Sequence, residues 1–394
     1  MAVWWILSVA LAQAQDTDAL RVETYNVGLA RGFVDNAIAR APAIAADLAV
    51  DPPDILCLQE AWNPEDREQL VAAVADTYPH SLMLPVTQHY ADAAPACRRK
   101  ELFGEDRFAS CMSSSCDGLD GDALTACVVS KCGPILRDLS SSNPQCANAV
   151  MAQVGKPALK AIWTVMRPMR KANMFAYDGS DGLILLSRYP LSDTGELDFT
   201  DIATLNRRRA LHADVSFQDT DVRVYCTHLT ANLDDTAPYP GAFGGWAEEN
   251  LAQVDRLLEH AGSHDGPVAI LGDLNTGPAV PSAGLVAEMS DSHDRIVAAG
   301  YDDPALLLET CTYCADNSMI DDDVGPRLID HAYLRGIDAR DGTRTRDQSV
   351  TLDGGLTTHL SDHFGYAVSL YFAPPPPPEP EPEPEPEPTP EPTP

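Results

Sequence analysis

Residues 268–275 read Val-Ala-Ile-Leu-Gly-Asp-Leu-Asn, an apolar run that passes directly into two polar side chains, Asp273 and Asn275. A short apolar run bounded by Gly and Asp is typical of a buried β-strand. The same arrangement recurs at the ends of other apolar runs, which carry Asn26, Glu60, His228, Asp330, Asp362 and His363. Because active sites commonly gather where strands end, we expect the eight side chains to form one site. Taken singly, each would be a turn or capping residue.

The remaining apolar pattern predicts one large domain in which strands and helices alternate loosely. Strands are expected at 20–27, 54–58, 182–187, 209–217, 222–227, 268–272, 327–334 and 364–372. Apolar residues at three- and four-residue spacing predict helices at 36–48, 66–75 and 245–260. The runs 209–217 and 222–227 resemble a hairpin. The mixture predicts an α+β sandwich of two packed sheets with helices outside.

The N-terminal segment predicts export. Residues 1–14 contain an apolar run too short to span a bilayer, and Ala12-Gln13-Ala14 supplies small residues at a cleavage spacing. No Lys or Arg follows Met1, and the alternative is a buried N-terminal strand or helix. We expect a signal peptide at 1–14 and a secreted protein, extracellular or periplasmic.

The ten cysteines also indicate an oxidising compartment. Irregular spacing without His predicts disulfides, with zinc as the rival, at Cys97, Cys111, Cys116, Cys127, Cys132 and Cys146. That segment has little apolar periodicity, so disulfides would hold it where a core cannot. Cys311 and Cys314 predict a structural bridge, the alternatives being a redox pair or half a metal site. Cys57 and Cys226 lie in apolar runs and are predicted to be buried free thiols.

Two segments depart from the strand and helix pattern. Residues 86–178 carry the cysteine cluster and a basic, Met-containing stretch, and we interpret them as an inserted, partly helical lid. The alternative is a surface decoration far from the chemistry. Residues 374–394 alternate Pro with Glu and Thr, which predicts an extended tail. The catalytic domain is therefore expected to span 20–373.

The chain is strongly acidic, with a formal net charge of −32. The tail contributes six glutamates, so the body itself is acidic. A protein that binds a polyanion usually presents a basic face, because its affinity comes from neutralised phosphates. Long nucleic acid is therefore a less natural substrate, although a divalent ion offsets part of the repulsion.

The strand-end residues include a set of hard oxygen ligands. Asn26, Glu60 and Asp362 offer the amide and carboxylate oxygens that Mg²⁺ takes in proteins. A metal there would polarise a phosphoryl oxygen and shield developing negative charge. The three residues therefore predict a site for one or two Mg²⁺ ions.

The other strand-end residues are suited to handling protons and phosphate. Asp330 and His363 offer a carboxylate that orients an imidazole and keeps it basic. Asp273 can accept a proton from water, and Asn275 can donate its amide to a phosphate oxygen. His228 remains as a donor to the phosphate or the leaving oxygen. Together they predict hydrolysis of a phosphate ester.

Seven motifs resemble the endonuclease/exonuclease/phosphatase superfamily in order and rough spacing. They are residues 20–27 with Asn26, Ile55-Leu56-Cys57-Leu58-Gln59-Glu60, residues 181–191, Thr227-His228-Leu229, Gly272-Asp273-Leu274-Asn275, Leu328-Ile329-Asp330-His331 and Ser361-Asp362-His363. Single motifs are weak evidence, but seven in order over residues 20–373 are specific. The resemblance implies a four-layered α/β sandwich with Mg²⁺ in a central cleft and in-line attack of water on a phosphate ester.

The resemblance also implies roles for the matched residues. Glu60 corresponds to the main metal ligand, with Asn26 and Asp362 beside it. The groups that activate water, hold phosphate and assist the leaving group correspond to His228, Asp273, Asn275, Asp330 and His363. His212, His331 and His359 have no counterpart and are expected to be structural or surface residues.

Local features resemble the neutral sphingomyelinase branch, at residues 182–191, 206–211 and 312–317. This implies phospholipase C-type chemistry on a phospholipid at a membrane surface, by a monomer. Secreted bacterial sphingomyelinases carry an aromatic hairpin before the final Asp-His, and residues 343–361 contain no Trp, Phe or Tyr. The stretch 166–175 of the insertion contains Met, Phe and basic residues and could contact a membrane in place of that hairpin. The alternative is a packed helix with a solvated basic edge.

Two other functions remain as alternatives. The first is a secreted deoxyribonuclease-type endonuclease, in which Arg207, Arg208 and Arg209 would contact the nucleic-acid backbone. The second is a non-catalytic binding module that keeps the fold. A binding module would have no need of both carboxylate ligands and the Asp330–His363 pair, which disfavours it.

Overall fold

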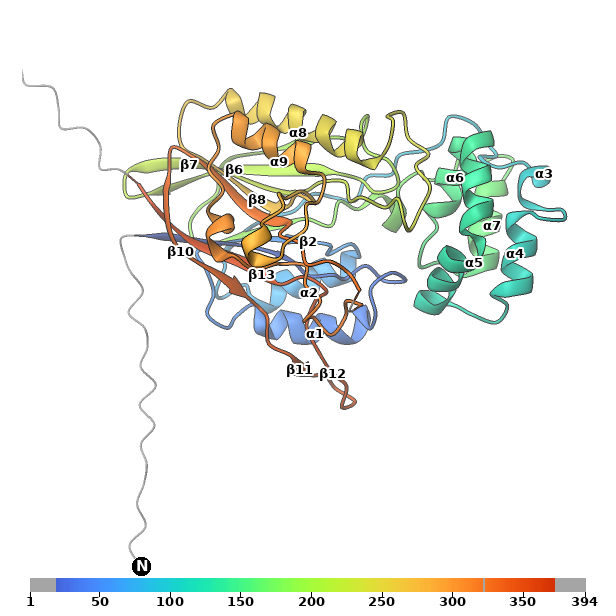
Figure 1. Cartoon of the computed structure of the whole chain (residues 1–394), viewed down its shortest axis with the longest axis horizontal. Coiled ribbons are helices and arrows are strands. Elements are labelled where there is room, and N and C mark those ends of the chain that lie inside the picture. The colour runs from blue at the N-terminus through green and yellow to red at the C-terminus, as the bar shows by residue number, and fades with distance from the viewer. Residues whose placement is uncertain (1–18, 322, 373–394) are drawn as a thin grey trace, which may run out of the picture.

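Two β-sheets with helices on their outer faces form the body of the protein (Figure 1). A computed structural model describes residues 19–321 and 323–372. The predicted signal peptide (1–14) and the predicted tail (374–394) lie outside these residues. Within them, no helix is long and apolar enough to cross a membrane.

The first sheet has six strands in the order β10-β13-β1-β2-β4-β3. Strands β1 and β2 are parallel, and the other neighbours are antiparallel. Its strands are β1 (Leu20–Asn26), β2 (Ile55–Gln59), β3 (His80–Leu82), β4 (Ile184–Ser187), β10 (Asp338–Thr345) and β13 (Gly365–Tyr371). A separate short hairpin pairs β11 (Val350–Thr351) with β12 (Thr357–Thr358).

The second sheet has five strands in the order β5-β6-β7-β8-β9. Strands β6 and β7 form the predicted hairpin, and β7 and β8 are parallel. Its strands are β5 (Ser192–Asp198), β6 (Arg209–Phe217), β7 (Thr220–His228), β8 (Val268–Asp273) and β9 (Asp330–Arg335). The sequence pattern missed β3, β5 and β10, which are edge strands with mostly polar, partly exposed residues.

Helices cover the outer face of each sheet (Figure 1). Helices α1 (Ala37–Asp47) and α2 (Pro64–Ala73) pack on the first sheet, and α8 (Trp246–Gly262) and α9 (Ser290–Ala298) pack on the second. Three short 3-10 helices lie in the loops, at Ala176–Gly179, Pro281–Ala283 and Pro304–Leu308. The predicted four-layered sandwich is therefore confirmed.

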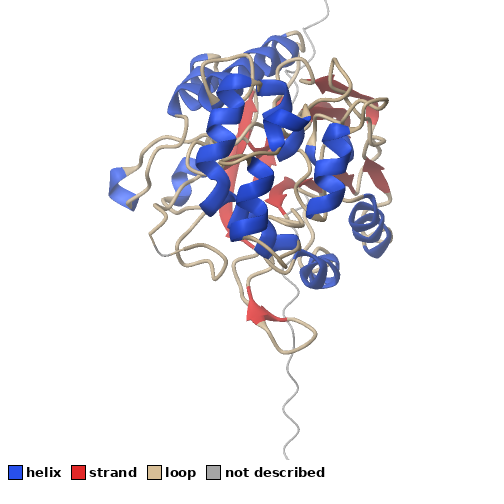
Figure 2. Cartoon of the chain, turned by 90° about the vertical axis from the view of Figure 1, so that its right-hand side faces the viewer, coloured by secondary structure: helices blue, strands red, loops and turns tan. Residues whose placement is uncertain are grey.

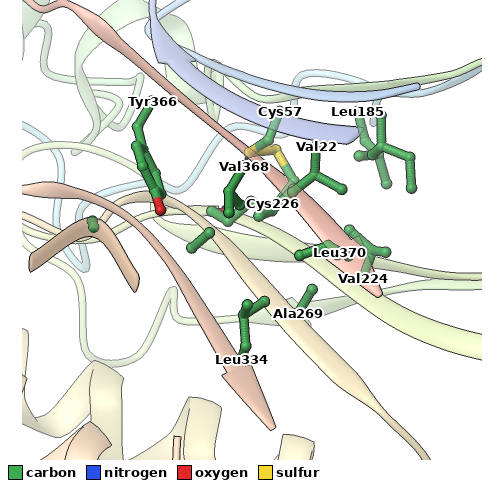
Figure 3. Close-up of a cluster of buried hydrophobic side chains, with 14 of the residues drawn as sticks. Val22, Cys57, Leu185, Val224, Cys226, Ala269, Leu334, Tyr366, Val368 and Leu370 are labelled. Carbon is green, nitrogen blue, oxygen red and sulfur yellow. Dashed lines mark hydrogen bonds between the residues drawn. A yellow bond between two sulfur atoms is a disulfide. The ribbon is translucent and has the colours of Figure 1, made fainter. Parts of the chain in front are cut away.

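The main core lies between the two sheets (Figure 3). Val22 and Cys57 of the first sheet and Val224, Cys226 and Ala269 of the second are completely buried there. Cys57 and Cys226 form a disulfide, with sulfur atoms 2.07 Å apart, that joins β2 to β7. The prediction of free thiols is wrong, because the two residues are 169 positions apart in sequence and only sheet packing brings them together.

The insertion is a group of helices at one end of the sandwich (Figures 1 and 2). It contains α3 (Arg99–Leu102), α4 (Phe108–Ser115), α5 (Gly121–Ser142), α6 (Pro144–Met151) and α7 (Ala158–Met166). The predicted disulfides are confirmed as Cys97–Cys146, Cys111–Cys132 and Cys116–Cys127, and Cys311 and Cys314 form the predicted bridge.

The expectation that this segment has no core of its own is wrong. Phe108, Met112, Leu124 and Leu136 pack in one cluster with the buried cysteines. Each helix of the insertion contributes only a few apolar side chains to this cluster. The helices pool these side chains only after they fold against one another.

We predict that the Cys57–Cys226 bridge stabilises the sandwich by about 3–5 kcal/mol, because it closes a long loop of the unfolded chain. The Cys57→Ala/Cys226→Ala variant should unfold at a clearly lower urea concentration than the native protein. Cys311→Ala/Cys314→Ala is the matched control, since that bridge spans only three positions and should contribute less. Equal shifts in the two urea midpoints would contradict this assignment.

Candidate active site

The strand registers bring the predicted site residues to one edge of the sandwich. In the second sheet, Asp273 is paired in register with both His228 and Asp330. In the first sheet, Asn26 is opposite Gln59, the residue before Glu60. Asp362 and His363 lie just before β13, which runs antiparallel to β1 and so begins at the same edge. The eight residues therefore come from two sheets that meet at one place.

Asp330 and His363 form the predicted pair. The Asp330 Oδ2 atom lies 2.9 Å from His363 Nδ1, and both residues are buried. Burial lowers the pKa of His363, but the carboxylates of Asp330 and Asp273 outweigh it and hold that pKa well above its usual range. The His363 imidazole is therefore protonated at neutral pH, with Nε2 3.8 Å from Asp273 Oδ2.

Asp273 lies at the centre of the site. Its Oδ2 accepts a hydrogen bond from Asn26 Nδ2 at 2.9 Å, and its Oδ1 accepts one from the Asn275 N–H at 2.9 Å. Burial, and next the charge of Asp330, raise the pKa of Asp273 to about 7. A carboxyl group with this pKa can exchange a proton near neutral pH, which suits a general base.

His228 differs from His363 in its charge. Burial and the guanidinium of Arg208 lower the pKa of His228 well below its usual range, so this imidazole is neutral at pH 7. Its Nε2 atom lies 3.4 Å from Asp273 Oδ2 and 3.9 Å from Glu60 Oε1. The sequence could not separate the two histidines, and their surroundings now shift their pKa values in opposite directions.

The three predicted metal ligands are close enough to influence one another. Burial raises the pKa of Glu60, and the neighbouring Asp362 carboxylate raises it further. Asn26 hydrogen-bonds Asp273, while its Oδ1 accepts the Gly28 N–H at 3.0 Å and keeps one lone pair. An excess of carboxylates with raised pKa values fits a divalent cation, which would remove the repulsion between them. Asp273, Asp330 and His363 also place ligand atoms within 4.8 Å of one another.

Asn275 lies two residues beyond β8 in a left-handed backbone conformation, with φ of 53°. Its Nδ2 donates to the Leu229 carbonyl at 3.1 Å, which leaves a second amide hydrogen for a ligand. Asn275 thus has a free amide donor beside Asp273, and its phosphate-binding role stays a prediction.

Side chains outside the predicted set hold this site in place. Thr312 Oγ1 accepts the backbone N–H of Asp330 at 3.2 Å, and Asn317 Nδ2 donates to the Ser361 carbonyl at 2.8 Å. Ser361 Oγ in turn donates to the Asn26 carbonyl at 2.7 Å. These bonds tie the final Asp-His loop to β1 and to the start of β9.

Arg208 also belongs to this site, although the sequence named it only together with Arg207 and Arg209, as a contact of a nucleic-acid backbone. It is 4% exposed and lines the same cavity as Glu60 and Asp273, with its guanidinium over the ring of Trp62 at 5.7 Å. Burial lowers its pKa to about 10, so it stays charged at neutral pH. Its Nε and Nη1 atoms have no hydrogen-bond partner among the described residues. A buried cation with free donors is suited to an anionic substrate group.

Arg207 and Arg209 are not available for the role that the nuclease hypothesis gave them. Both are buried, and they form ion pairs with Asp198 at 2.7 Å and with Asp181 at 3.2 Å. The three neighbouring arginines look alike in sequence. They lie just before β6 and at its first residue, and of the three only Arg208 lines the cavity at the site.

The other histidines have the structural roles expected of them. His331 is buried, with Nδ1 3.0 Å from Asp303 Oδ2 and Nε2 2.8 Å from the Thr276 carbonyl. His212 packs beside the ring of His260, and the half-buried His359 accepts the Ser318 N–H at Nδ1, at 2.8 Å. None of the three lines the cavity at the site.

A family model described as the Endonuclease/Exonuclease/phosphatase family matches residues 24–363. The chain belongs to this family. Members of the Endonuclease/Exonuclease/phosphatase family are hydrolases that act on phosphoester bonds and use divalent metals. The predicted superfamily and the predicted class of enzyme are therefore confirmed.

Three solved structures are similar to this chain. SmcL is 13% identical with a TM-score of 0.52, and the match covers 89% of this chain and 99% of SmcL. Sphingomyelinase C from Streptomyces griseocarneus is 18% identical with a TM-score of 0.49, over 89% and 99% of the two chains. A humanized TDP2 from D. rerio is 14% identical with a TM-score of 0.48, over 90% and 99%. At 13% identity, the likeness to SmcL shows the fold alone.

One curated relative is an uncharacterized protein in the pal 3' region of Legionella pneumophila. It is 28% identical over 130 residues, which are 30% of this chain. The chain matches 62% of the length of that relative.

We predict that Mg²⁺ affinity rises with pH, because the cation must displace a proton from Glu60, whose pKa is raised by burial and by the Asp362 carboxylate. Titration calorimetry in buffers of different ionisation enthalpy should therefore detect proton release on binding. Glu60→Gln and Asp362→Asn should each weaken Mg²⁺ binding by about tenfold or more. Asp316→Asn, an exposed acid outside the site, is the control. Unchanged affinity in both site variants would disprove the ligand assignment.

Proposed function

We propose that this protein is a secreted, Mg²⁺-dependent phosphodiesterase that acts on a phospholipid, with sphingomyelinase-like, phospholipase C-type chemistry. Five disulfides support an oxidising compartment and hence export. The observation that carries the choice of a lipid is an exposed apolar and basic surface on helix α7 of the insertion.

This surface is unusual for an acidic protein. Leu159, Trp163 and Met169 are 85%, 60% and 92% exposed. They lie among four basic residues, Lys160, Arg167, Arg170 and Lys171. The guanidinium of Arg167 packs over the Trp163 ring at 5.7 Å. Exposed Trp and Leu beside Lys and Arg are typical of surfaces that lie in a membrane interface with anionic lipids.

Residues 166–175 were predicted to contact the membrane, and the exposed apolar residues lie partly before this stretch. Met174 and Phe175, which the sequence pattern included, are buried and cannot reach a membrane. Leu159 and Trp163, one helical turn apart on α7, take their place. An amphipathic pattern does not say which of two apolar faces is covered, and packing decides it.

The reaction follows from the charge states of the site residues. The divalent ion, when bound, polarises a phosphoryl oxygen and shields developing negative charge. Asp273 takes the proton of the attacking water, and protonated His363, oriented by Asp330, gives a proton to the leaving oxygen. His228, Asn275 and Arg208 donate hydrogen bonds to the phosphate oxygens.

The nuclease alternative has less support. A nuclease needs basic side chains that are free to meet a long backbone. Arg207 and Arg209 are paired internally, and the body of the chain is acidic. A non-catalytic binding module would not need the protonated His363 beside Asp273. Both alternatives remain outcomes of the experiments below.

We predict that the purified protein releases phosphocholine from sphingomyelin with Mg²⁺ and not with chelator. Sphingomyelin, plasmid DNA and inositol phosphates are assayed in parallel. Glu60→Ala and His363→Ala should each lower turnover by about 10²-fold or more, since each removes a group acting in the transition state. His89→Ala, at an exposed histidine that does not line the cavity, is the control. Nicked plasmid without phosphocholine release would favour the nuclease, and turnover unaffected by both site variants would reject this chemistry altogether.

We further predict that Leu159→Ala/Trp163→Ala binds phosphatidylcholine/phosphatidylserine vesicles about tenfold or more weakly than the native protein, because it loses the apolar contacts with the interface. Vesicle sedimentation measures this binding. Leu307→Ala is the matched control, since Leu307 is 83% exposed on another surface. Hydrolysis of a water-soluble phosphodiester should be the same in all three proteins. Equal vesicle binding by the α7 variant and the control would exclude this docking surface.

A further inference from the structure

A cavity of about 680 Å³ extends from the candidate active site into the helical insertion. At one end it is lined by Glu60, His228 and His363. At the other end its wall comes from α4, α5, α6 and α7, with Met112, Leu124, Val128, Val150 and Ile162. The volume falls within the range of small-ligand pockets, about 300–1,000 Å³. The active site and the interior of the insertion therefore share one continuous space.

The wall in the insertion offers almost no free polar group. In the described segment 108–165, the only polar side chains that line the cavity are Thr125, Gln153 and Lys156. Thr125 and Gln153 donate to carbonyls one turn earlier, at 3.2 and 2.9 Å, and Lys156 pairs with Asp178 at 2.9 Å. A space lined in this way is poorly suited to water and to polar ligands, and well suited to hydrocarbon.

Helix α7 separates this cavity from the exposed surface described above. Ala158, Ile162 and Val165 line the cavity, while Leu159 and Trp163 face solvent. A helix with apolar side chains on two opposite faces is normally covered by other apolar groups on both faces. The apolar wall of the cavity thus lies one helix away from the surface proposed to meet lipid.

The insertion is held against the catalytic body at the mouth of the cavity. The Gly32 N–H donates to Asp122 Oδ1 at 2.6 Å. Gly32 has φ of 84°, and a Cβ there would lie 2.8 Å from the Gly155 Cα, so the two backbones touch. Tyr177 stacks on Trp62 with ring centroids 5.1 Å apart. These contacts favour the interpretation of the insertion as a lid over the alternative of a surface decoration far from the active site.

We propose that this cavity, which we call the chain chamber, binds a hydrocarbon chain of the same lipid whose phosphodiester lies at the active site. The inference rests on the proposed function, because the phosphate must be held by the catalytic residues. The inference goes beyond the proposed function because it assigns a role to the insertion, which is to recognise the apolar part of the substrate. The enzyme then acts on a lipid molecule drawn partly out of its bilayer.

The test uses phosphocholine esters of ethanol, butanol, hexanol and octanol, all below their micelle concentrations. Each methylene that enters the chain chamber should raise kcat/KM by about fourfold, the equivalent of about 0.8 kcal/mol. Val128→Trp, which fills the chamber from α5, should lower the octyl-to-ethyl ratio of kcat/KM by about tenfold or more. Ala126→Trp adds the same side chain on the exposed side of α5 and should leave both the ratio and the activity unchanged.

The outcomes separate this inference from the proposed function. Turnover of bis-p-nitrophenyl phosphate with Mg²⁺, together with a flat chain-length series, would overturn the chain chamber and leave the phosphodiesterase standing. An octyl-to-ethyl ratio that survives Val128→Trp would also overturn it. Val150→Trp, from α6, repeats the test if Val128→Trp does not fold. If no phosphodiester is hydrolysed at all, the proposed function fails first.

Discussion

The site is built around an excess of buried or partly buried carboxylates where the two sheets meet. Glu60, Asp273, Asp330 and Asp362 converge there, and His363 and Arg208 are the cations among them. Burial, and next the neighbouring carboxylates, raise the pKa values of Glu60 and Asp273, and the carboxylates of Asp330 and Asp273 raise that of His363. Like charges buried together are costly without a cation, which agrees with the proposed metal site and the proposed proton-transfer roles.

The strand pairing explains why these charges are tolerated. Asp273 is in register with His228 on one side and Asp330 on the other, so each side chain is held by a backbone ladder. The Cys57–Cys226 bridge and the core between the sheets hold the two halves of the site together. Buried charge of this kind is costly, and it persists where the surrounding structure supports it and chemistry requires it.

The insertion adds an apolar element to this polar site. Its helices have their own core and three disulfides, and they contact the body near Gly32 and Trp62. A catalytic edge made of charges and a neighbouring wall made of hydrocarbon together match a molecule with a phosphate at one end and an apolar chain at the other. A two-sheet body without the insertion would lack this apolar wall.

The sequence by itself determined the central strands, the order of the site residues and their chemical types, because apolar runs ending in Asp273, His228 or Asn26 carry a local signal. It did not predict the polar edge strands β5 and β10, which pair through backbone groups and show no apolar pattern. Tertiary structure alone decided that Cys57 meets Cys226, that Arg208 faces the site while Arg207 and Arg209 are paired elsewhere, and that the two histidines differ in charge. Each of these depends on burial and on contacts between residues far apart in sequence, which no local pattern records.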